Sequence, residues 1–239
     1  MKPWLLAWPL IFLLLLASLS SAAQQSPLSE TQAQQSFLHR LVASAIERTH
    51  HSVRYVSAYV RIPYPGGDVP ADTGVCTDEI IRIYRAVGID LQKQVHEDMS
   101  KNFALYPHRW QSTSAQPDSN IDHRRVPNLM VFFSRKGESL PTTRPADYSP
   151  GDLVTWDLGG GVPHIGMVVD TKSSTTGRYL IVHNIGEGPK WKTCCSIGES
   201  QGITAISVRR PSSAANRATC SLLHFEYDER PIVGWMRAA

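Results

Sequence analysis

A stretch early in the chain, residues 72–88, alternates apolar and charged positions with the period of an α-helix. One face carries the apolar side chains and a thiol: Cys76, Ile80, Ile83, Tyr84 and Val87. The other face carries charged side chains: Asp78, Glu79, Arg82 and Arg85. The pattern predicts a short amphipathic helix with Cys76 at its N-terminal end, facing the interior. Asp72 or Thr73 is expected to cap its first backbone amides, and Gly88 to end it.

Helical spacing also occurs in residues 32–56, 91–103 and 129–136. Strand-like segments follow in the second half of the chain, at residues 153–157, 162–170 and 179–184. Short glycine-rich or polar turns separate these three segments, so we expect an antiparallel meander. Helices packed on such a sheet give an α+β fold.

The composition fits one principal domain. The chain has 239 residues, of which 42% are hydrophobic, and a formal net charge of +3. A chain of this size can bury a substantial core. The weak net charge gives no reason to expect binding to a polyanion, so nucleic acid is excluded as an expected partner.

The N-terminus has the pattern of a secretory signal peptide. Lys2 precedes an apolar run, residues 4–17, and the small residues Ser21, Ala22 and Ala23 follow. We predict a signal peptide over 1–23, an N-terminal helix over 24–56 and the main domain over 57–239. A retained membrane anchor is the alternative, but the run is short for a span. After cleavage no integral span is expected, and the protein would be periplasmic or secreted.

The four cysteines do not form the framework of a small disulfide-rich domain. Cys194, Cys195 and Cys220 lie together late in the chain, and Cys76 stands alone. We expect Cys76 to be free; a bridge from Cys220 to Cys194 or to Cys195 remains open.

Cys76 is the candidate nucleophile, with an inert buried cysteine as the alternative. Asp72, Asp78 and Glu79 crowd the same turn and would raise the pKa of the thiol, so a histidine partner is expected. His164 lies at the start of a predicted strand, and a polar residue on the next strand could orient it. For His164 alone, a structural histidine is the alternative. Together the three form a nucleophile, base and orienter.

A polar cluster precedes the helix predicted at 129–136. Asp122, His123, Arg124 and Arg125 could bind substrate carboxylates, which arginine matches with two parallel hydrogen bonds. The alternative is a solvated or internally paired loop.

Several motifs in order resemble the bacterial domain-of-unknown-function family numbered 1287, over roughly residues 46–189. These motifs are Gly74 to Asp78, Asn120 to Leu129, Trp156 to Leu158, Pro163 to Gly166 and Val182 to Gly186. That family looks like a branch of the NlpC/p60-like, papain-type cysteine peptidases. The resemblance implies a papain-like fold with the nucleophile at a helix N-terminus packed on an antiparallel sheet.

The resemblance also implies roles for single residues. Cys76 is the implied nucleophile, His164 the base and His183 the third polar residue, with Asn184 as the alternative orienter. Trp156 joins the candidate substrate-binding residues. Members of the wider clan cleave cell-wall peptides, often beside γ-D-glutamyl or diaminopimelyl residues. One departure from the family is a predicted insertion at 190–219, whose role as a lid, a partner contact or an unstructured loop is open.

We therefore expect an exported cysteine peptidase or amidase that acts on peptidoglycan stem peptides without a cofactor. Two alternatives remain: a thiol acyltransferase using the same cysteine and histidine, and a catalytically inactive wall-binding module. A metal site is the weakest rival, because the sequence lacks His-x₃-His and Cys-x₂-Cys spacing. The oligomeric state is open.

Overall fold

The computed structural model describes residues 30–107, 116–140, 145–186, 188–193 and 204–207. The chain divides into two compact units, residues 1–33 and 34–239, and the description that follows concerns the second. The predicted signal peptide and the cysteines Cys194, Cys195 and Cys220 lie outside the described residues. Within the described residues, none of the helices has the length and apolar character needed to cross a membrane.

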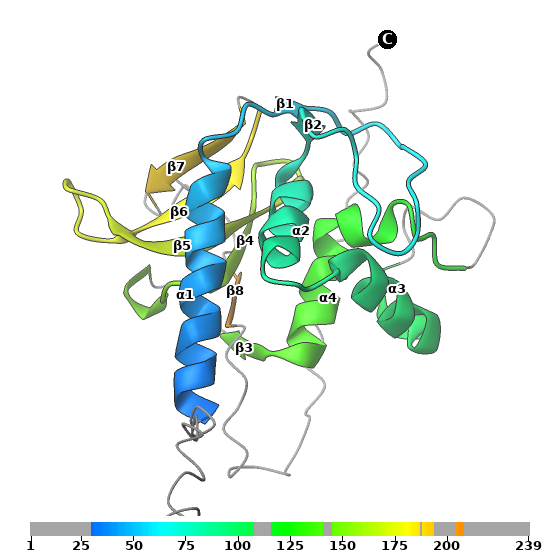
Figure 1. Ribbon diagram of the computed structural model, residues 1–239, viewed down its shortest axis with the longest axis horizontal. Helices are drawn as coiled ribbons and strands as arrows, with labels where there is room; N and C mark the ends of the chain where they lie inside the picture. Colours follow the sequence, from blue (N-terminus) through cyan, green and yellow to red (C-terminus); the bar gives the residue numbers. More distant parts are fainter. Residues whose placement is uncertain (1–29, 108–115, 141–144, 187, 194–203, 208–239) are drawn as a thin grey trace, which may run out of the picture. The chain divides into compact units, whose positions relative to one another are not determined.

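The described residues form helices and two sheets (Figure 1). The α-helices are α1 (Glu30–Arg48), α2 (Cys76–Ala86), α3 (Leu91–Lys101) and α4 (Val126–Lys136). Short 3-10 helices are η1 (Phe103–Leu105), η2 (Asp122–Arg124) and η3 (Pro145–Asp147). The strands are β1 (Arg54–Tyr55), β2 (Thr73–Gly74), β3 (Glu138–Leu140), β4 (Leu153–Asp157), β5 (Pro163–Lys172), β6 (Tyr179–Asn184), β7 (Pro189–Thr193) and β8 (Thr204–Ser207).

The main sheet has six strands in the order β3-β8-β4-β5-β6-β7, and every neighbouring pair is antiparallel. The predicted meander of three strands is confirmed as β4, β5 and β6, and the α+β class is confirmed with it. The registers put Trp156 opposite His164 and Met167 opposite Val182. The small second sheet pairs β1 and β2 in parallel.

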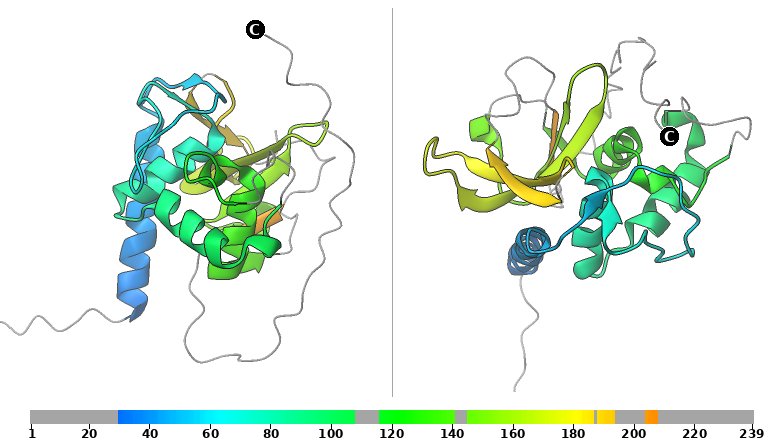
Figure 2. Two further views of the ribbon diagram at one scale, coloured as in Figure 1. Left: turned by 90° about the vertical axis from the view of Figure 1, so that its right-hand side faces the viewer. Right: turned by 90° about the horizontal axis from the view of Figure 1, so that it is seen from above.

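Successive side chains of β5 point to opposite faces of the sheet, as expected for a strand. Ile165, Met167 and Val169 belong to the main apolar cluster, which also includes Cys76 and residues of α1, α2, α3 and α4. Val168 belongs to a second cluster on the opposite face, with Tyr148, Val154, Trp156 and Ile181. In Figures 1 and 2, α3 and α4 lie on the side of α2 away from β6 and β7.

Two predicted helix boundaries are wrong. The first helix ends at Arg48 rather than near residue 56, because residues 49–51 turn and Arg54–Tyr55 instead pair with Thr73–Gly74. The helix predicted from residue 129 begins at Val126. Pro127 fits in its first turn, because proline lacks a backbone N–H and the N–H groups of a first turn have no partner within the helix.

The predicted cap of α2 is also wrong. The N-cap residue is Val75, whose side chain has no acceptor. The carboxylate of Asp78, in the first turn, accepts the backbone N–H of Val75 at 2.7 Å instead. The cap therefore comes from inside the helix rather than from Asp72 or Thr73.

The segment predicted as an insertion, residues 190–219, is described only at 190–193 and 204–207. Residues 190–193 belong to β7, which pairs with β6. Residues 204–207 form β8, which lies between β3 and β4. The role of the segment stays a prediction.

Candidate active site

Cys76 is the first residue of α2 and packs against the sheet. Its side chain is 4% exposed and its thiol is free, as expected from the cysteine spacing. The sulfur accepts hydrogen bonds from the backbone N–H groups of Ile165 and Thr77 and from the hydroxyl of Tyr55. The helix end and β5 thus meet at this sulfur.

Burial raises the pKa of the Cys76 thiol to about 12, and the carboxylate of Asp78 also raises this pKa. The three hydrogen bonds lower the pKa, since they favour a thiolate, but burial outweighs them. The thiol is therefore protonated at neutral pH. A base has to take its proton before or during attack on a carbonyl.

The other two acidic neighbours, Glu79 and Asp72, are paired with arginines. Glu79 is buried and pairs with Arg48 at 2.7 Å and with Arg82 at 3.5 Å. Asp72 is exposed and pairs with Arg54 at 2.9 Å. The charged face of α2 is therefore not a solvated surface, because Asp78, Glu79 and Arg82 are all buried in ion pairs.

Tyr55 is a site residue that the sequence did not reveal. It is 40% exposed, and its hydroxyl donates to the Cys76 sulfur. Burial of the hydroxyl raises its pKa, and the neighbouring Cys76 raises it further. The pairing of Tyr55 with Gly74 in the parallel β1–β2 sheet brings the ring here. Strands of two residues leave no periodic signal, so this approach could not be predicted.

His164 and His183 form a pair of buried rings. Nε2 of His164 lies 2.9 Å from Nδ1 of His183, within hydrogen-bond distance. The indole of Trp156 packs on both rings, with centroid distances of 4.7 Å to His164 and 5.3 Å to His183. Trp156 is opposite His164 in the β4–β5 register, which explains the contact. The structure thus brings three of the predicted site residues together.

Gly166 lets the two histidines come this close. A Cβ at this position would lie 2.5 Å from Cγ2 of Ile181, 2.9 Å from the carbonyl oxygen of Val182 and 3.1 Å from Cβ of His183. Any side chain here would push β5 away from β6. The glycine between the two histidine-bearing strands is therefore a requirement of their close pairing.

Asn184, the alternative orienter, points elsewhere. Its Nδ2 donates to the carbonyl oxygen of Gly74 at 3.4 Å, and its Oδ1 accepts the N–H of Gly186 at 3.1 Å. It therefore braces the backbone two residues before Cys76. Of the two candidates for the orienting role, His183 is the one in contact with His164.

The sulfur of Cys76 reaches β5 at the amide of Ile165, one residue after His164. The rings of His164 and His183 lie with Trp156, whose cluster occupies the other face of the sheet. The site therefore has a helix half, defined as Cys76, Asp78, Glu79 and their arginine partners. It also has a sheet half, defined as His164, His183 and Trp156. The two halves meet at the start of β5.

The polar cluster at residues 122–125 is engaged internally. Arg124 is buried and grips Asp78 with Nε–Oδ1 and Nη2–Oδ2 distances of 2.8 Å and 3.0 Å. Asp122 accepts the backbone N–H of Asp118, and burial raises its pKa to about 6. Burial lowers the pKa of His123 to about 3. Arg125 is partly buried. Substrate binding by these residues and by Trp156 stays a prediction.

Within the described ranges, there is no group of three or more histidine, cysteine, aspartate or glutamate side chains that could hold a metal ion.

Comparison with known proteins gives a family without an assigned activity. A protein-family model described as "Domain of unknown function (DUF1287)" matches residues 42–203, more than half of the 239-residue chain. A relative from Escherichia coli (strain K12), named "Uncharacterized protein YijF", is 54% identical over 135 residues. This match covers 56% of the present chain and 64% of the relative, so the chain spans a little under two thirds of that relative. The activity has to be argued from the site.

Proposed function

The chain belongs to the DUF1287 family, and on that premise we propose that it is an exported cysteine hydrolase that cleaves amide bonds in peptidoglycan stem peptides. The observation that supports this most is the buried free thiol at the N-terminus of α2, in contact with β5 at Ile165, the residue that follows His164 of the His164–His183 pair. A thiol, an imidazole that takes its proton and a second ring on that imidazole are the parts that nucleophilic catalysis needs. The approach of the His164 ring to the sulfur is part of the proposal. We also propose that the family is a branch of the NlpC/p60-like, papain-type peptidases.

The proposed tautomer of His164 follows from its contact with His183. If Nε2–H of His164 donates to Nδ1 of His183, then Nδ1 of His164 carries the lone pair that accepts a proton. His183 would fix this tautomer and stabilise the imidazolium once it forms. The choice of Nε2 of His164 as the donor is part of the proposal.

The proposed reaction has two steps. In the first, Nδ1 of His164 takes the proton of Cys76 as the sulfur attacks the substrate carbonyl carbon. The same proton then passes to the leaving amine as the C–N bond breaks, which leaves a thioester. In the second, His164 activates a water that releases the carboxylic acid and restores the thiol. The high pKa of Cys76 supports proton removal during the attack rather than a thiolate formed beforehand.

The oxyanion formed in each step needs hydrogen-bond donors. We propose that the backbone N–H of Cys76 at the start of α2 is one donor and that the hydroxyl of Tyr55 is the second. The contact of this hydroxyl with the sulfur supports its role, because a group that close to the nucleophile also lies close to the attacked carbonyl. The partial exposure of Tyr55 leaves it within reach of a substrate.

The test is incubation of the mature protein with purified cell-wall sacculi, followed by mass spectrometry of the released muropeptides. The wild type is expected to release fragments cut at one amide bond, and Cys76→Ala and Cys76→Ser are expected to release none. Their unfolding midpoints in urea control for folding. Binding of sacculi by all three proteins without cleavage by any would favour an inactive wall-binding module. Products that carry an added amine would favour the acyltransferase.

A further inference from the structure

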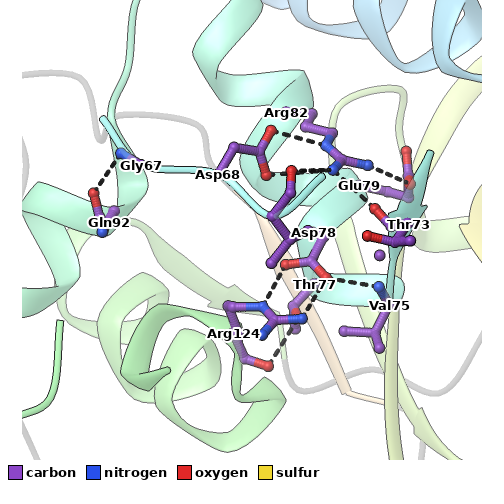
Figure 3. Close-up of polar contacts among 12 residues, drawn as sticks. Gly67, Asp68, Thr73, Val75, Thr77, Asp78, Glu79, Arg82, Gln92 and Arg124 are labelled. Carbon is purple, nitrogen blue, oxygen red and sulfur yellow. Dashed lines mark hydrogen bonds and ion pairs between the residues drawn. The ribbon is translucent and has the colours of Figure 1, made fainter. Parts of the chain in front are cut away.

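A buried ion pair lies beside the thiol, on the charged face of α2. Arg124 of η2 binds both carboxylate oxygens of Asp78, at 2.8 Å from Nε and 3.0 Å from Nη2. Each of the two side chains is only 2% exposed (Figure 3). Such paired hydrogen bonds between two ionised groups are short, directional and strong. Asp78 is two residues after Cys76, so the pair is part of the same helical turn as the nucleophile.

The pair also fixes the backbone on both sides of Cys76. Oδ2 of Asp78 accepts the N–H of Val75 at 2.7 Å, just before the cysteine. The hydroxyl of Thr77, just after it, donates to the carbonyl oxygen of Arg124 at 2.8 Å. Arg124 further donates from Nη1 to the carbonyl oxygen of Ala58 at 3.2 Å, in the segment that follows Tyr55. The start of α2 is thus tied to η2 through one arginine (Figure 3).

The pairing of Asp78 with Arg124 affects the charge around the Cys76 sulfur. On α2 itself, Asp78 raises the pKa of Cys76 and also that of Tyr55, because its carboxylate disfavours a second negative charge. The next carboxylate, Glu79, is matched by Arg48 and Arg82. From β1 the group that meets the sulfur is the hydroxyl of Tyr55, and from β5 it is the backbone N–H of Ile165, the residue after His164. Arg124 supplies the positive charge opposite Asp78.

We propose that Arg124 is a positioning residue of this site, which holds Asp78 as the cap of the nucleophile helix and offsets part of its charge beside Cys76 and Tyr55. The carboxylate supplies the cap that Val75 cannot supply, and the guanidinium weakens the effect of the negative charge on thiolate formation. Arg124 acts through Asp78 and not on a substrate. The inference goes beyond the proposed hydrolysis, and it rests on Cys76 only as the reacting group.

The test is a double-mutant cycle with the alkylation rate of Cys76 by iodoacetamide as the readout, measured between about pH 7 and pH 9. Removing one charge next to a titrating group shifts its pKa by about one unit or more. Since a more basic thiolate is also more nucleophilic, one unit changes the rate by about threefold below the pKa. Arg124→Gln should slow alkylation by about threefold or more, and Asp78→Asn should speed it by a similar factor. The double variant should return close to the wild-type rate.

The opposite signs separate the proposal from a merely structural role. If the pair only stabilised the fold, both single variants would change the accessibility of the sulfur in the same direction, and that result would overturn the proposal. Unchanged rates in both would overturn it as well. Arg124→Lys keeps the charge and loses the two parallel hydrogen bonds, so its rate should stay near that of the wild type even if Arg124→Gln unfolds.

A matched control is available on α3 and α4. Arg135 and Asp98 form a second ion pair at 2.8 Å, with Asp98 buried. Asp98→Asn and Arg135→Gln should leave the alkylation rate of Cys76 unchanged. Alkylation needs no substrate, so a protein that fails to cleave sacculi can still pass this test. If the wild type cleaves sacculi but the two single variants shift the alkylation rate in the same direction, the proposed function is retained and the role proposed for Arg124 is rejected.

Discussion

The helix half and the sheet half of the site bury polar groups in different ways. The helix half buries carboxylates, and each is matched by an arginine from a distant part of the chain: Asp78 by Arg124, and Glu79 by Arg48. The sheet half buries two imidazoles against an indole, joined by one hydrogen bond. A buried charge is tolerated only with a partner, whereas a neutral ring needs only its hydrogen bonds.

This difference indicates that the two halves have different roles. The ion pairs of the helix half fix geometry, because breaking either pair leaves an uncompensated charge in the interior. In the proposed reaction one ring of the sheet half takes a proton, and the second ring can stabilise the new charge. Variants that affect only positioning or only proton transfer would test this difference in roles.

The largest effect is expected for His164→Ala. Loss of the base that takes the thiol proton should lower the rate of sacculus cleavage by about 10²- to 10⁴-fold, because the protonated thiol of Cys76 is a poor nucleophile. The rate should be followed as muropeptide release at several pH values. His183→Ala should lose less, because it removes the partner of the base and leaves the base itself.

The control for this prediction is His51→Ala, which changes a largely exposed histidine after α1. It should cleave at the wild-type rate. If His164→Ala cleaves sacculi as fast as the wild type, the sheet half takes no part in proton transfer.

The contrast between the halves also explains what the sequence could predict. Residues 153–157 and 179–184 were predicted as strands, and β4 and β6 have these bounds. Alternation with a period of two is a local signal, and it also placed His164 and Gly166 on one face. His164 could therefore be anticipated from the alternation, whereas the role of His183 was implied by the family resemblance. The packing of Trp156 on both rings could not be predicted.

The helix half was less predictable for a physical reason. Periodicity shows which residues share a face and says nothing about what covers that face. The charged face of α2 is covered by partners such as Arg48 and Arg124, which are far away in the sequence. Tyr55 reaches the sulfur through the two-residue parallel pairing of β1 with β2, which also leaves no periodic pattern in the sequence. Tertiary contacts therefore decide the burial of these charges.

A smaller effect is expected for Gly166→Ala, which tests the sheet half alone. The added methyl would lie 2.5 Å from Cγ2 of Ile181, so β5 and β6 must separate. Overpacking of this kind costs about 1–3 kcal/mol in the free energy of unfolding, measured by urea denaturation. The contact between His164 and His183 should weaken with it, which NMR titration of the two imidazoles would detect.

Val169→Ala is the matched control, because it alters a fully buried residue of the same strand on the helix face. It should lower stability as well, but it should leave the titration of His164 and His183 unchanged. Equal shifts of the imidazole pKa values in both variants would mean that the two faces of β5 are not independent.

The smallest effect is expected for Asp122→Asn, which tests whether a matched arginine is the rule for buried carboxylates near α2. Burial raises the pKa of Asp122 from its ordinary value to about 6, whereas Arg135 and its neighbours hold the pKa of Asp98 below its ordinary value. A carboxyl with a raised pKa stabilises the fold fully at pH values below its unfolded pKa of about 4, and this stabilisation is lost as the pH rises through about 6. The wild type should therefore gain on the order of 1 kcal/mol over Asp122→Asn as the pH falls from about 7 to about 4, measured by urea unfolding. A loss of stability over the same pH range would mean that Asp122 is held ionised, and a charged partner would then be the rule for this buried carboxylate as well.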